Sequence, residues 1–148
     1  MVEFYCLRVV RRVKINAPHE YLIATYNDIA SVKNLVDANV RDLAAILLEP
    51  MIGFGVAVPA DRDFLVQLRK IAAAAGAVLI YDEVMTSRMY SGGGIQSDFP
   101  TEHRPDMTAL GKDIGGGMSF GAFGGKREIM KNIRSPETGR SCAGGDIQ

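Results

Sequence analysis

The sequence predicts an α/β fold with a mostly parallel sheet and flanking helices. Two apolar runs of strand length, "LAAILL" and "AVLIY", lack the polar alternation of a strand that has one face in water. Such runs are typical of parallel strands that are covered on both faces. A helical pattern separates the two runs and no hairpin signal joins them. This order of elements favours parallel strands connected by right-handed crossovers.

The segment before the first apolar run predicts a strand followed by a helix. The β-rich run "EYLIATYND" ends at Asn27 and Asp28, and Asp28 stands where the N-cap of a following helix is expected. Behind it, apolar residues recur at helical spacing in "DIASVKNLVDANV": Ile29, Val32, Leu35 and Val36.

A second helix is predicted within "PADRDFLVQLRKIAAAAG", between the two apolar runs. Asp61 is placed to cap its start and Gly76 to end it. One helical stripe carries the apolar side chains Phe64, Leu65, Leu68, Ile71, Ala72 and Ala75. The run "AVLIYDEV" then returns the chain to the sheet as the next buried strand.

After a glycine-rich loop, the remaining elements are short. "DMTAL" and "FGAFGG" predict two strands, and "KREIMKNI" predicts a short helix. From Arg134 onward no apolar periodicity is present. We therefore expect an N-terminal extension over residues 1–15, one α/β unit over 16–133, and an irregular C-terminus over 134–148.

Composition and charge narrow the classes of partner. The chain has 148 residues, of which 47% are apolar and 23% charged, the balance of a globular domain. Seventeen basic and 17 acidic residues leave no net charge, which argues against nucleic acid and anionic membranes as partners. We expect a small molecule or a protein instead.

The cysteines and histidines do not indicate a metal site. Cys6 and Cys142 lie near opposite ends, and His19 and His103 are the only histidines, so no zinc-like spacing is formed. No secretory signal or membrane span is predicted, and we expect a cytoplasmic protein with free thiols. The basic residues of "RVVRRVK" leave an organelle transit peptide as the alternative.

The glycine-rich loops do not match phosphate-binding or hydrolase motifs. A Walker A loop fails at "GK" because Asp113 follows Lys112, and no G-x-G-x-x-G pattern is complete. "GMSFG" has the letters of a nucleophile elbow around Ser119, but three glycines precede it where a strand is required. ATPase and serine hydrolase chemistry are therefore disfavoured.

Asp82 and Lys112 suggest a different chemistry. Asp82 lies at the carboxyl end of the predicted strand "AVLIYDEV", and Lys112 follows the predicted strand "DMTAL" through a single glycine. Parallel sheets bind ligands at the carboxyl ends of their strands. A lysine held there becomes a nucleophile toward aldehydes, and pyridoxal 5'-phosphate requires such a lysine together with a carboxylate for its ring nitrogen. The alternatives are that Asp82 caps a short helix and that Lys112 is an ordinary surface lysine.

The two motifs "YDEVMT" and "ALGKDIGGG" together resemble the class III pyridoxal-phosphate-dependent aminotransferases, with similarity from about Tyr21 to Met130. The resemblance implies the large domain of a fold-type I enzyme, in which Lys112 forms a Schiff base with pyridoxal 5'-phosphate. It also implies that Asp82 pairs with the ring nitrogen and that Val84 packs on the ring. Small amino and keto substrates and a homodimer are implied as well. Amino-group transfer would follow either the transaminase or the aminomutase course.

The sequence departs from the family pattern in several places. Phe54 stands where relatives carry a small or polar residue, and Ser119 where they have proline. In "CAGGDIQ", Gly145 or Asp146 falls at the position of a threonine that reaches the cofactor phosphate, and neither has a hydroxyl. The sequence assigns no role to Glu49, at the end of the run before Pro50, or to Phe54. We therefore expect a fragment of the domain, with an inactive remnant or a partner-binding module as the alternative.

Overall fold

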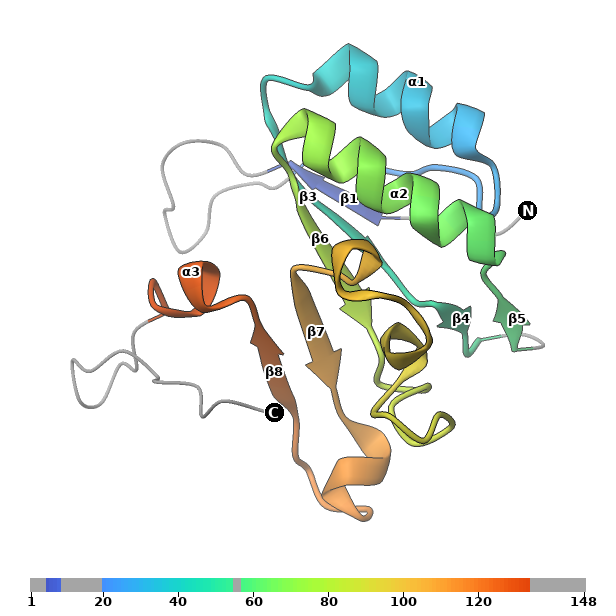
Figure 1. Cartoon of the computed structure of the whole chain (residues 1–148), viewed down its shortest axis with the longest axis vertical. Helices are drawn as coiled ribbons and strands as arrows, with labels where there is room; N and C mark the ends of the chain where they lie inside the picture. The colour runs from blue at the N-terminus through green and yellow to red at the C-terminus, as the bar shows by residue number, and fades with distance from the viewer. Residues whose placement is uncertain (1–4, 9–19, 55–56, 134–148) are drawn as a thin grey trace.

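The computed structural model describes residues 5–8, 20–54 and 57–133, which form one six-stranded sheet with helices and a small separate hairpin (Figure 1). The order of strands across the sheet is β2-β1-β3-β6-β7-β8. Its strands are β1 (Tyr5–Arg8), β2 (Glu20–Leu22), β3 (Leu43–Leu48), β6 (Val78–Asp82), β7 (Met107–Leu110) and β8 (Ala122–Gly125). The hairpin pairs β4 (Met51–Ile52) with β5 (Val58–Pro59).

The helices connect these strands. The α-helices are α1 (Ile29–Asn39), α2 (Arg62–Ala75) and α3 (Arg127–Met130), and the 3-10 helices are η1 (Ile95–Asp98), η2 (Thr101–His103) and η3 (Lys112–Gly115). The predicted strands and helices between residues 20 and 133 are thus present. The prediction of a helix in "KREIMKNI" is confirmed, although the helix has only four residues.

The centre of the sheet is parallel, which confirms the predicted α/β fold. β3 pairs with β6 and β6 with β7, both in parallel. Both edges are antiparallel, because β1 pairs in that sense with β2 and β3, and β8 does so with β7. The sequence predicted strands at β2 and β8 but not their antiparallel pairing. It did not indicate β1 or the β4–β5 hairpin, whose strands have only two residues each.

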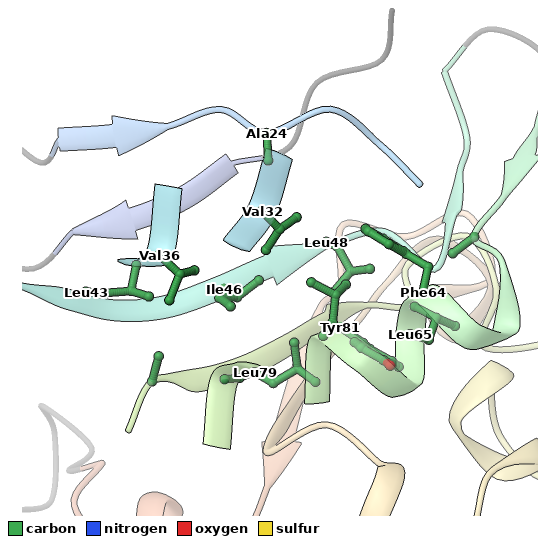
Figure 2. Packing of buried hydrophobic residues seen from close by; sticks show 14 of the residues in the cluster. Ala24, Val32, Val36, Leu43, Ile46, Leu48, Phe64, Leu65, Leu79 and Tyr81 are labelled. Atoms are coloured by element: carbon green, nitrogen blue, oxygen red, sulfur yellow. The ribbon is translucent and has the colours of Figure 1, made fainter. Parts of the chain in front are cut away.

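Two helices cover one face of the sheet and form the core with it. α1 and α2 lie side by side over β3 and β6 (Figure 1). In Figure 2, Val32 and Val36 of α1 lie over Ile46, and Leu65 of α2 lies against Tyr81. Leu68, Ala72, Leu79 and Tyr81 have no exposed surface. Side chains alternate between the two faces of β6. Leu79 and Tyr81 face the helices, and Asp82 therefore belongs to the other face of the sheet.

The two helices begin differently. Asp28 caps α1 as predicted, since its Oδ1 accepts hydrogen bonds from the backbone N–H of Ala30 and of Ser31, each at 3.0 Å. Asp61 occupies the N-cap position of α2, but its side chain makes no capping hydrogen bond. α2 ends as predicted at Gly76, which adopts a left-handed conformation with φ of 67°.

These caps give a matched pair of variants. We expect Asp28→Ala to lower the free energy of unfolding by about 1 kcal/mol, because two N–H groups of α1 lose their acceptor. Asp61→Ala should cost only a few tenths of a kcal/mol, since no capping bond is lost. Urea denaturation of both variants measures the difference. Equal losses would show that the Asp28 bonds contribute no specific stability.

Several sequence predictions fall at or beyond the limits of the described residues. Residues 5–8, within the segment expected as an N-terminal extension, form β1 and pair with β2 and β3. The segment 134–148, with its "CAGGDIQ" turn and Cys142, lies outside the described residues, as does His19.

Among the residues that are described, no helix is long and apolar enough to cross a membrane. Over the same residues, no three His, Cys, Asp or Glu side chains are grouped to hold a metal ion.

Candidate functional site

Asp82 and Lys112 lie at the end of the sheet where its central parallel strands finish. Asp82 is the last residue of β6 and stands opposite Ala109 of the neighbouring parallel strand β7. β7 ends at Leu110, and Lys112 begins η3 after the single residue Gly111. The carboxyl ends of two adjacent parallel strands therefore bring the acid and the lysine into one region, as the sequence predicted.

Val84 connects the turn after β6 with the turn that carries Lys112. A Cβ atom placed on Gly111 would lie 3.3 Å from both methyl carbons of Val84, which is closer than side chains normally pack. Gly111 thus allows the Val84 side chain to rest directly on the backbone next to Lys112. The backbone segments that carry Asp82, Val84 and Lys112 therefore lie in one region, at the carboxyl ends of β6 and β7.

The carboxylate of Asp82 has one occupied and one available oxygen. Its Oδ1 accepts a hydrogen bond from the Val84 backbone N–H at 3.0 Å, and the side chain is half-buried. Oδ2 has no hydrogen-bond partner among the described residues. The residues after Asp82 form hydrogen-bonded turns rather than the short helix of the alternative interpretation. Asp82 therefore stabilises the first turn and still presents an acceptor to a ligand.

Lys112 has a backbone conformation that is unusual for a side-chain-bearing residue. Its φ is +46°, in the left-handed region, and such strain costs of order 1–3 kcal/mol and occurs preferentially at functional sites. The residue is exposed, as expected for a surface lysine. However, it also lines an open cavity of about 620 Å³ together with Arg88, Asp113, Gly116 and Gly117.

Sequence reasoning missed the role of Glu83. The side chain has no exposed surface, and its carboxylate accepts three hydrogen bonds from the loop that follows the site. The donors are Ile95 N at 2.9 Å, Gln96 N at 3.1 Å and Thr86 Oγ1 at 2.5 Å. The available signal was the second acid of "DE" at a strand end followed by a glycine loop. Glu83 fixes that loop beside Asp82.

A second missed residue is Asp106, just before β7. Its carboxylate lies 2.6 Å from Arg69 Nη1 of α2 and 2.7 Å from Lys126 Nζ, and it accepts the Leu79 backbone N–H at 2.8 Å. Burial alone would raise the pKa of Asp106, but the bonds from Lys126, Leu79 and Arg69 outweigh it and hold the pKa below its ordinary value. Asp106 thus joins α2, β6 and the residue before α3 at the amino end of β7, opposite the strand ends that carry Asp82 and Lys112.

Glu49 and Phe54 are not among the residues that line the cavity of Lys112, and Asp82 and Val84 are not among them either. Glu49 Oε2 accepts the Gly53 backbone N–H at 3.0 Å, and the Glu49 carbonyl accepts the Tyr26 hydroxyl at 2.9 Å. Glu49 therefore shapes the turn between β3 and β4. Phe54 is 96% exposed at the tip of the β4–β5 hairpin.

Comparison with known proteins identifies relatives of this chain. The family model described as "Aminotransferase class-III" matches residues 7–147. The glutamate-1-semialdehyde 2,1-aminomutase of Chlorobaculum parvum is 50% identical over 115 residues, which are 78% of this chain and 26% of that protein. The chain therefore spans about a quarter of the length of the curated relatives it matches.

Solved structures share the fold. A β-phenylalanine aminotransferase from Variovorax paradoxus superimposes with a TM-score of 0.73 at 40% identity, over 87% of this chain and 29% of that chain. A glutamate-1-semialdehyde aminomutase from Pseudomonas aeruginosa, in complex with PMP, superimposes with a TM-score of 0.60 at 25% identity, over 70% of this chain and 22% of that chain. A further transaminase, with a TM-score of 0.69 at 31% identity over 83% of this chain and 28% of that chain, has PLP bound.

Proposed function

This chain belongs to the class-III aminotransferase family, and from that premise we propose that it contributes to amino-group transfer with pyridoxal 5'-phosphate. The observation that carries the proposal is the convergence of Asp82 and Lys112. They lie at the carboxyl ends of adjacent parallel strands, and Val84 packs against the glycine beside the lysine. A carboxylate, an amine and an apolar surface are the three groups that the cofactor's ring requires.

The residues present fit the ring of the cofactor. Asp82 has an oxygen without a partner among the described residues, which suits a ring N–H donor. Val84 offers a branched apolar side chain at the level of that carboxylate, and Lys112 has no hydrogen bond or ion pair to any described residue. When bound, the cofactor supplies an aldehyde and a protonated ring that stabilises negative charge on the substrate carbon.

Each residue then has a defined task. Lys112 Nζ would hold the cofactor through its aldehyde, and the same amine would serve as the base that moves a proton at the substrate carbon. Asp82 Oδ2 would hold a proton at the ring nitrogen. The Val84 side chain would pack on the ring between these two groups. The left-handed backbone of Lys112 directs the side chain from a fixed turn rather than from a mobile loop.

The substrates follow from the chemistry of transfer. We propose small amino and keto compounds, with transaminase and aminomutase courses distinguished by whether a second keto compound is needed. We also propose a homodimer, supported by large apolar side chains exposed near the site: Met89 at 57%, Met118 at 78% and Phe120 at 59%. We propose residues 16–133, together with β1 of the same sheet, as the part of the cofactor-binding domain that this chain contains.

Lys112→Ala tests the proposed function directly. We expect the wild-type chain mixed with pyridoxal 5'-phosphate to develop an absorbance that the variant lacks, because Lys112 follows the strand that pairs with the strand of Asp82. Lys70→Ala, which removes an exposed lysine of α2, is the control and should leave the absorbance unchanged. Borohydride reduction and peptide mapping identify the attached lysine.

Two outcomes would contradict this proposal. The first is attachment that persists in Lys112→Ala, which would show reaction at other lysines. The second is a wild-type chain without lysine-dependent absorbance, which would favour the alternative of an inactive remnant or a partner-binding module. A positive result leads to the next measurement, in which the need for a second keto acid separates the two courses of transfer.

A further inference from the structure

Arg88 occupies a fixed position in the turn after β6. The Ser87 backbone N–H donates to the Glu83 carbonyl at 2.9 Å, and the Met89 N–H donates to the Thr86 carbonyl at 3.0 Å. The residues on either side of Arg88 are therefore held to the segment that Glu83 anchors. Glu83 and Thr86 have no exposed surface, so the backbone from which the Arg88 side chain projects is tied to the core.

The Arg88 side chain is available to a ligand. It is exposed, and it makes no hydrogen bond or ion pair with any of the described residues. It lines the same cavity of about 620 Å³ as Lys112, together with Asp113, Gly116 and Gly117. Two cations and one anion thus face this cavity. Gly116 and Gly117 have open space where a Cβ would stand, so a small ligand has access to their backbone.

We propose that Arg88 binds a carboxylate of the substrate and thereby selects amino acids over simple amines. The proposal deepens the proposed function and rests on Lys112 being the reacting residue. In an amino acid, the carboxylate lies a few bonds from the amine that reacts. A cation that lines the cavity of the reactive lysine is placed to bind it. The planar guanidinium matches a carboxylate with two parallel hydrogen bonds.

The charges of the cavity favour a carboxylate over a phosphate group. Phosphate is the other anion that a guanidinium binds well. However, Asp113 lines the same cavity, and a phosphate group offers no cation to pair with this carboxylate. Asp113 is instead suited to the ammonium group of an amino acid. The cavity therefore pairs opposite charges with both ends of such a substrate.

The first experiment needs no cofactor. The chain without pyridoxal 5'-phosphate is titrated with succinate and, separately, with inorganic phosphate at constant ionic strength, and the backbone amide signals of Gly116 and Gly117 are followed by NMR. We expect succinate to shift these signals, and Arg88→Gln to weaken its binding about 10-fold or more, since a hydrogen bond to a charged group contributes roughly 1.5–3 kcal/mol. Arg88→Lys should bind with intermediate affinity, because it keeps the charge but loses the planar fork.

The control and a second measurement show whether Arg88 binds a substrate carboxylate or the phosphate group of the cofactor. Arg41→Gln removes an exposed guanidinium from the turn after α1 and should leave succinate binding unchanged. Attachment of pyridoxal 5'-phosphate to Lys112 should have the same affinity in Arg88→Gln as in the wild type. Unchanged succinate binding in Arg88→Gln would overturn the proposal. So would a loss of affinity for phosphate and for the cofactor alone, which would assign Arg88 to the cofactor. The titration requires no cofactor, so its result can be interpreted even if Lys112 does not react with pyridoxal 5'-phosphate.

Discussion

Asp106→Asn is expected to lower the free energy of unfolding by about 3–5 kcal/mol, the range typical of breaking a buried ion pair at one partner. The substitution keeps the shape of the side chain and removes its charge. Arg69, whose side chain is only 10% exposed, would then have no anion at the 2.6 Å contact. Lys126 is 55% exposed, so water and salt screen its share of the loss. Urea denaturation at neutral pH measures the effect.

The same carboxylate predicts how stability depends on pH. Because the pKa of Asp106 in the folded chain is lower than its ordinary value, the folded state binds this proton more weakly than the unfolded state. The stabilisation is therefore complete above the ordinary pKa of an aspartate and is lost as the pH falls toward the lower folded value. Asp106→Asn should flatten this acid limb of the stability curve.

A surface ion pair of the same chain provides the control. Lys33 and Asp37 form an i,i+4 pair on α1 with side chains 63% and 62% exposed. Asp37→Asn should change the free energy of unfolding by less than 1 kcal/mol and leave the acid limb in place. Equal losses for Asp37→Asn and Asp106→Asn, or an unchanged acid limb in the latter, would show that the buried contacts do not stabilise the fold.

The local pattern of the sequence predicted most elements of the fold. The strands β3 and β6 are continuous apolar runs, as expected for central parallel strands, but on β6 only the side chains that face the helices are fully buried and those between them are half-buried. α2 has an apolar stripe because only one of its faces meets that sheet. The antiparallel edges could not be found in this way. A short strand such as β8 has alternating half-exposed residues, two of them glycine, and its partner is chosen by the register of β7.

The site was predictable only where its residues stand at strand ends. Asp82 ends β6 and Lys112 follows β7 through a single glycine, so their placement in one region followed from the topology. Arg69, Asp106 and Lys126 are far apart in the sequence, and nothing local indicates that α2 brings an arginine to the start of β7. Arg88 was missed for a related reason, since only the turn geometry shows that it faces the lysine's cavity.

Glu83→Gln is expected to destabilise the chain by about 2–4 kcal/mol and to loosen the loop beside Asp82. The side chain is fully buried and accepts from Ile95 N, Gln96 N and Thr86 Oγ1. A glutamine has one acceptor oxygen, so its NH₂ group would face at least one of these donors. Leaving a buried donor unsatisfied costs about 1–3 kcal/mol, and the loss of hydrogen bonds to a charged group adds to it.

Gly94 allows the same interaction to be tested from its other side. A Cβ on Gly94 would lie 2.5 Å from Glu83 Oε2, and its φ is +102°, where side chains are strained. Gly94→Ala should therefore also displace the carboxylate. In a double-mutant cycle, the combined variant should lose less stability than the sum of the two single losses, because both changes break one set of bonds.

The exposed Glu102 of η2 supplies the matched control, since Glu102→Gln makes the same chemical change without burial. It should shift the free energy of unfolding by less than about 0.5 kcal/mol. Amide hydrogen exchange at Ile95 and Gln96 should accelerate in Glu83→Gln alone. If both glutamates can be replaced at equal cost, or if the cycle is additive, Glu83 does not anchor the loop. The position of Asp82 would then depend on β6 and β7 alone.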